Sequence, residues 1–157
     1  MPTATRVCAS LAVLGLVVAV AGTFLPWFHS GEMERGSYEA AALLAHFDLV
    51  RNAFAGAALR GWVAMPLLAA GCVALYALRL PRTAAAATTV LSILVGTVAV
   101  LTLVQGGGEG ATGAVGVSAT GPLTTTTGMI LALLGALGVL GTLSRAGATT
   151  GRAGVRP

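Results

Sequence analysis

The sequence predicts an all-α fold: a four-helix transmembrane bundle with one amphipathic extracytoplasmic helix in the first outer loop. Composition is the first reason, since 56% of the 157 residues are hydrophobic and only 9% are charged. A soluble domain is about one quarter charged, so the bilayer is the solvent that suits this chain. The second reason is charge placement, which leaves four long stretches without a charged residue. Each is close to the roughly 20 apolar residues that a helix needs to cross the hydrocarbon.

The four expected spans belong to a single integral membrane domain over residues 1–145. The second is the shortest, and it holds Pro66 at a position early in the helix where proline is tolerated. We expect outer loops at 29–60 and 105–122 and a disordered cytoplasmic tail at 146–157. The spans are expected near residues 7–28, 61–80, 84–104 and 123–143.

The first span has an alternative reading as a secretory signal peptide, because a basic start precedes an apolar run and a small-residue pattern at Ala19–Gly22. The apolar run continues past that pattern to Trp27, which favours a retained helix. The two cysteines, Cys8 and Cys72, lie at different expected depths, so we expect packing roles for both and no disulfide between them.

Arginines predict the orientation. Six arginines and no acidic residue fall on one side of the expected spans, whereas the other side holds three arginines and all five acidic residues. This positive-inside bias places both termini in the cytoplasm of a multi-pass protein of the bacterial plasma membrane. The six arginines on the inner side are Arg6, Arg79, Arg82, Arg145, Arg152 and Arg156.

Small residues recur every three or four positions in three of the spans. Such residues let membrane helices approach closely, so the rhythm favours a compact bundle, although Ala and Gly are common enough here for one such stripe to arise by composition. The expected helix-packing residues are Ala12, Gly15, Ala19 and Gly22 in the first span, Ser92, Gly96 and Ala99 in the third, and Gly128, Ala132 and Gly135 in the fourth.

The first outer loop begins with a polar turn and then shows helical periodicity, with Ser37 as N-cap and Gly56 as stop. We expect an amphipathic helix there, on the membrane surface or on the bundle. Aromatic residues are enriched where partners dock. The docking candidates of this loop are Trp27, Phe28, Tyr38, Phe47 and Phe54.

Catalytic and metal sites are not expected. The histidines His29 and His46 lie near Glu32, Glu34 and Asp48, but their spacing fits no recognised ligand pattern. The second outer loop, rich in Gly, Thr and Ala, lacks the lysine of a phosphate-binding loop and is expected to be a flexible linker or a short extended hairpin. We therefore predict no catalytic residue, no cofactor and no bound metal.

The segment after the first span carries a family resemblance. The residues Pro26, Trp27, Ser30, Gly31, Arg35, Ser37 and Tyr38, with a Gly-rich fourth span, make the chain similar to the small, mostly uncharacterised four-helix transmembrane proteins of mycobacteria and other actinobacteria. The resemblance implies the topology and a host of that kind, and it implies no mechanism.

Three functions remain open at this point. The favoured one is a non-catalytic accessory or assembly subunit of a larger membrane or cell-envelope complex, with lipid and a membrane-protein partner or further copies of itself around it and no nucleic acid. A transporter or channel component formed by oligomerisation is the first alternative; it conflicts with spans that hold no Asp, Glu, Lys, Arg or His in their cores. The second is a membrane enzyme with its site in the outer loop, between His29 and Asp48.

Overall fold

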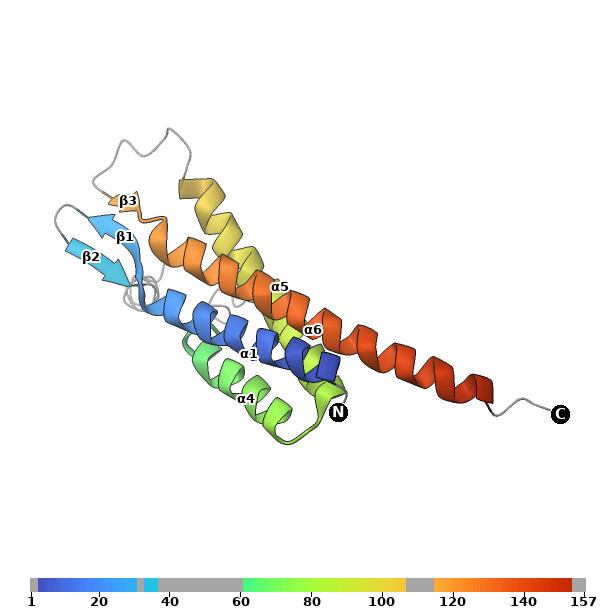
Figure 1. The fold of residues 1–157 in the computed structure, drawn as a ribbon. Helices are drawn as coiled ribbons and strands as arrows, with labels where there is room; N and C mark the ends of the chain where they lie inside the picture. The colour runs from blue at the N-terminus through green and yellow to red at the C-terminus, as the bar shows by residue number, and fades with distance from the viewer. Residues whose placement is uncertain (1–2, 31–32, 37–60, 107–114, 154–157) are drawn as a thin grey trace.

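The computed structural model describes residues 3–30, 33–36, 61–106 and 115–153. Within these residues, helices α1, α4, α5 and α6 form an elongated bundle, and a small three-stranded sheet lies at one of its ends (Figure 1). The body of the protein is therefore helical, as predicted. Three of the helices have stretches long and apolar enough to cross a membrane; these stretches are Thr3–Phe24, Pro81–Val104 and Thr120–Arg145.

Helix α1 spans Thr3–Phe24 and ends four residues earlier than the predicted 7–28. The reason is Pro26, which has no N–H to continue the helix and disfavours helical geometry in the residue before it. The chain instead enters strand β1, Pro26–Ser30. This moves Trp27 from a helix to a strand.

Helix α4 spans Met65–Ala77, 13 residues of the 20 that we predicted for 61–80. Residues 61–63 are also helical, but a turn at Ala64 separates them from α4. Pro66 lies in the first turn of α4 and cannot donate to the carbonyl of Trp62, which explains the interruption. A helix of 13 residues is about 20 Å long, less than the hydrocarbon thickness of roughly 30 Å.

Helices α5, Pro81–Gly106, and α6, Thr120–Ala153, are longer than the spans predicted at 84–104 and 123–143. Each carries a proline at or near its start, where the missing N–H costs nothing. The predicted disordered tail is wrong for residues 146–153, which extend α6; residues 154–157 lie outside the described part.

The sheet was not predicted as such. Strand β1 is central and pairs antiparallel with both β2, Met33–Gly36, and β3, Val115–Val117, in the order β2-β1-β3. Phe28 is opposite Arg35 on one side and Val117 on the other. The sheet thus joins the chain that follows α1 to the chain that precedes α6.

Helices α1 and α6 run antiparallel in close contact along most of α1 (Figure 1). Near the start of α1, the Oγ1 atoms of Thr5 and Thr142 are joined by a hydrogen bond of 3.1 Å. Near the end of α1, Gly22 contacts Thr125. Between these two points, the backbones of α1 and α6 contact each other directly. A Cβ at Gly15 would lie 2.6 Å from the carbonyl oxygen of Gly128 and would also collide with the backbone nitrogen of Ala132.

The remaining helices complete the bundle around this pair. Helix α6 also packs on α5, and α4 packs on α5 and, less extensively, on α1. One core cluster lies in the middle of the bundle and the other toward the end where the chain begins. The largest members of the central cluster are Leu16, Met65, Leu91 and Met129.

Candidate functional site

Trp27 is the first of the predicted docking residues, and the structure removes it from that role. Its side chain is only 3% exposed. The indole Nε1 donates a hydrogen bond of 3.0 Å to the carbonyl oxygen of Gly22, and the ring meets Trp62 edge-on with 5.2 Å between ring centroids. Gly121 leaves room for this indole, because a Cβ there would collide with it. Through these contacts, Trp27 connects β1 with the end of α1, the start of α6 and the segment before α4.

The structure does not test the other docking candidates. Phe28 is described only by its backbone in β1. Tyr38, Phe47 and Phe54, and with them the expected amphipathic helix, lie outside the described residues.

The histidines and acids of the outer loop are only partly described. The Cα atoms of His29 and Glu34 are paired across β1 and β2. Glu32, His46 and Asp48 lie outside the described residues. Among the residues that the structure does describe, no group of three His, Cys, Asp or Glu side chains could hold a metal ion.

The predicted helix-packing residues separate into two groups. Those of α1 and α6 meet each other at the antiparallel contact, where Ala12, Ala19 and Ala132 have no exposed surface and Gly135 lies against the backbone of Ala12. In α5, Ala99 is fully buried, whereas Ser92 and Gly96 line an open groove between α5 and α6.

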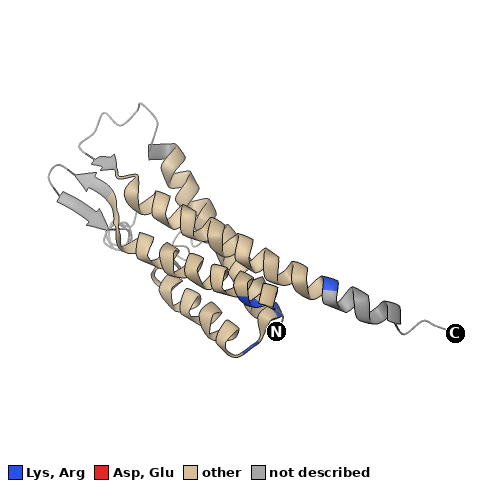
Figure 2. Cartoon of the chain, viewed as in Figure 1, with Lys and Arg blue, Asp and Glu red and all other residues tan. Residues whose placement is uncertain are grey.

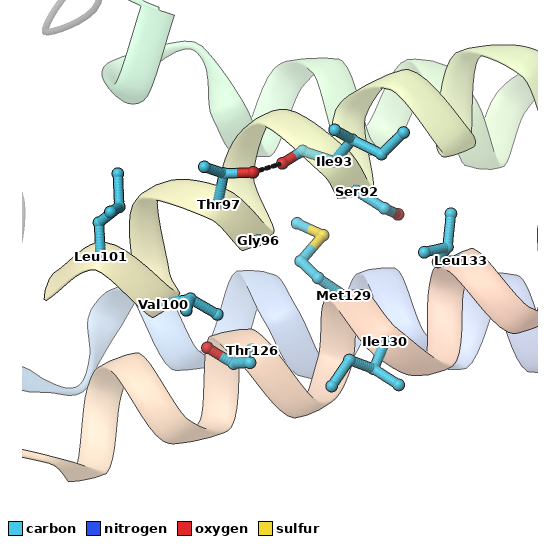
Figure 3. A pocket seen from close by; sticks show the side chains of 10 residues that line it. All are labelled: Ser92, Ile93, Gly96, Thr97, Val100, Leu101, Thr126, Met129, Ile130 and Leu133. Atoms are coloured by element: carbon cyan, nitrogen blue, oxygen red, sulfur yellow. Dashed lines mark hydrogen bonds between the residues drawn. The ribbon is translucent and has the colours of Figure 1, made fainter. Parts of the chain in front are cut away.

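This α5–α6 groove has a volume of about 370 Å³ and is almost entirely apolar. Figure 3 shows Gly96 in its floor, with Met129 of α6 facing it. A Cβ at Gly96 would make only one contact, at 3.6 Å to the Cβ of Met129, so space remains above it. The groove is lined by Ser92, Ile93, Gly96, Thr97, Val100 and Leu101 of α5 and by Thr126, Met129, Ile130 and Leu133 of α6.

Two hydroxyl groups in this groove have no hydrogen-bond partner: Ser92 Oγ and Thr126 Oγ1. Several threonines of the helices bond instead to a carbonyl one turn earlier, as Thr97 does to Ile93 at 2.6 Å (Figure 3). An unpaired hydroxyl also occurs at Thr125, which does not line the groove. Because Ser92 is 4% exposed, its hydroxyl is a buried polar group that still has capacity for a partner.

Comparisons with known proteins add no assignment: no family model, no curated protein and no solved structure matches this chain. The resemblance to actinobacterial four-helix proteins therefore stays a prediction.

Proposed function

We propose that the protein is a four-pass integral protein of the bacterial plasma membrane that acts as a non-catalytic accessory or assembly subunit, and that its α5–α6 groove receives a transmembrane helix of another membrane protein. Three apolar helices of membrane-spanning length support the membrane assignment. The shorter α4 completes the fourth pass together with the helical residues 61–63. The positive-inside bias of the arginines supports termini in the cytoplasm.

The α5–α6 groove is the observation that supports a partner helix. It lies between residues 92–101 of α5 and residues 126–133 of α6, toward the sheet end of the bundle. Its floor is the small residue Gly96, and small residues are what allow membrane helices to pack closely. Ser92 and Thr126 supply unpaired hydroxyls of the kind that hydrogen-bond between helices in the membrane. The α1–α6 contact shows that this chain already uses small residues to bring two helices together.

Shape is expected to contribute more than the hydroxyls. Hydrogen bonds between membrane helices are worth about 0.6 kcal/mol on average, so Ser92→Ala is expected to weaken binding only about threefold. A large side chain in place of Gly96 fills the floor of the groove and is expected to prevent binding.

A photoreactive phenylalanine analogue tests this proposal at two adjacent positions of α5. Position 93 lines the α5–α6 groove, whereas position 94 lies on the α4 side of the same helix, and both native side chains are more than half exposed. In intact cells we expect position 93 to crosslink to a transmembrane peptide of a different protein, identified by mass spectrometry. Position 94 should not, and Gly96→Leu should abolish the adduct. Gly71→Leu on α4, where a Cβ meets nothing within 4 Å, is the matched control.

Two results would count against this assignment. A crosslink to a second copy of the chain would favour the channel or transporter alternative formed by oligomerisation. Adducts to lipid alone from both positions would show that the groove has no protein partner.

A further inference from the structure

A second groove lies between α1 and α4, at the end of the bundle where the chain begins. Its volume is about 610 Å³, and its lining includes Arg6, Ser10, Val13, Leu14, Tyr76 and Arg79. Cationic side chains thus lie in the same groove as apolar ones. The other two grooves described between helices, α4–α5 and α5–α6, have no charged lining residue.

The charge in this groove is positive and is not neutralised there. Both Arg6 and Arg79 are exposed, and no acidic residue is part of the lining. Figure 2 shows that the basic residues of the coloured helices all lie toward this end of the bundle, and that these helices carry no acidic residue. The groove therefore presents a site for an anion.

The apolar part of the groove continues from the arginines toward the middle of the bundle. It runs along α1 through Val13, Leu14 and Val17, of which Leu14 is 56% and Val17 is 57% exposed. Arg6 and Val17 are eleven positions apart on α1, which is a rise of roughly 16 Å. That length matches one leaflet, half of a hydrocarbon core of roughly 30 Å.

The backbone at Arg79 gives an independent reason to assign a role to its side chain. Arg79 has φ of 59°, and it is the only non-glycine residue with positive φ in the described part of the chain. It occupies the position after the end of α4 that glycine usually takes: its N–H donates to the carbonyl of Tyr76, and the next N–H, of Leu80, donates to that of Leu75. Strained residues of this kind cluster at functional sites.

We propose that the α1–α4 groove binds one anionic phospholipid, with the phosphate held by Arg6 and Arg79 and an acyl chain along Val13, Leu14 and Val17. Basic pockets between membrane helices on the cytoplasmic side bind such headgroups. The inference uses the membrane location proposed above but not the protein partner, so the two can fail separately.

Lipid binding by the purified protein tests this proposal. In mixed detergent micelles containing phosphatidylglycerol or phosphatidylcholine, native mass spectrometry counts the lipids retained and titration gives their affinities. We expect one phosphatidylglycerol to bind in preference to phosphatidylcholine. Each of Arg79→Gly and Arg6→Gln should weaken it about fivefold, as expected for the loss of one basic group near a lipid surface.

Arg82→Gln is the matched control, because Arg82 lies at the same end, is exposed, and is not part of the groove lining. It should leave the affinity unchanged. Arg79→Gly also separates binding from folding: glycine suits the positive φ, so the thermal midpoint should not fall. Val13→Trp should weaken retention of the lipid by filling the apolar part of the groove.

Three results would overturn the proposal. Equal losses from Arg82→Gln and Arg79→Gly would show a general effect of charge at this end. Unchanged affinity in both Arg6→Gln and Arg79→Gly would show that the groove is not the site. Displacement of the lipid by excess inorganic phosphate, together with no effect of Val13→Trp, would show an anion site without specificity for lipid.

Discussion

Gly128→Val is expected to separate α1 from α6 and to lower the free energy of unfolding by at least about 3 kcal/mol. A Cβ at Gly128 would lie 2.7 Å from the Cα of Ala19 and 2.7 Å from the carbonyl oxygen of Gly15, and would also collide with the backbone nitrogen of Ala19. These are main-chain atoms, so no side-chain rotation relieves the overlap. Unfolding by sodium dodecyl sulfate in mixed micelles, followed by circular dichroism, measures the change.

Gly141→Val provides the control for this experiment. Gly141 lies on the same helix, α6, but a Cβ there meets nothing within 4 Å. The same chemical change should therefore alter the free energy of unfolding by less than about 0.5 kcal/mol. Equal effects of the two substitutions would show that helix propensity, and not the α1–α6 contact, determines the outcome.

Trp27→Ala is expected to cost about 3–5 kcal/mol, the usual range for removing a large buried aromatic side chain. The substitution leaves a cavity beside Trp62 and Gly121 and removes the hydrogen bond to the carbonyl of Gly22. Trp27→Phe keeps a ring but loses the N–H, so it should cost less, with about 1 kcal/mol from the hydrogen bond.

Fluorescence gives a second readout of Trp27→Ala. The chain has two tryptophans, so Trp62 becomes the only one in this variant. Its emission should shift to longer wavelength as the end of the bundle opens. Wild-type stability together with unchanged Trp62 emission would contradict the role assigned to Trp27.

The sequence predicts the helical body well because the physics involved is local. Apolar stretches bounded by arginine indicate spans, and the three- and four-residue rhythm of Ala12, Gly15, Ala19 and Gly22 indicates the face of α1 that meets α6. The rhythm does not indicate which helix packs against each face. In α5, Ser92 and Gly96 follow the same rhythm but line a groove.

The features that sequence reasoning missed depend on contacts between distant segments. Trp27 looks like an interfacial aromatic residue when it is considered alone, and it is buried only because Gly121 and Trp62, far along the chain, meet it. The sheet has the same origin, since β1 and β3 are separated by most of the chain and their paired strands are short. The end of α1 before Pro26 and the interruption of α4 near Pro66 could have been predicted from proline alone.

Cysteine accessibility in intact cells tests most directly whether the bundle crosses the membrane with its basic end in the cytoplasm. In a background with Cys8→Ala and Cys72→Ala, Ser30→Cys reports on the sheet end in β1 and Ser144→Cys reports on the opposite end, where Ser144 is exposed on α6. A membrane-impermeant maleimide should label Ser30→Cys in intact cells and Ser144→Cys only after permeabilisation. Labelling of both from outside, or of Ser144→Cys alone, would contradict this topology. It would also remove the membrane orientation that the roles proposed for the α5–α6 and α1–α4 grooves require.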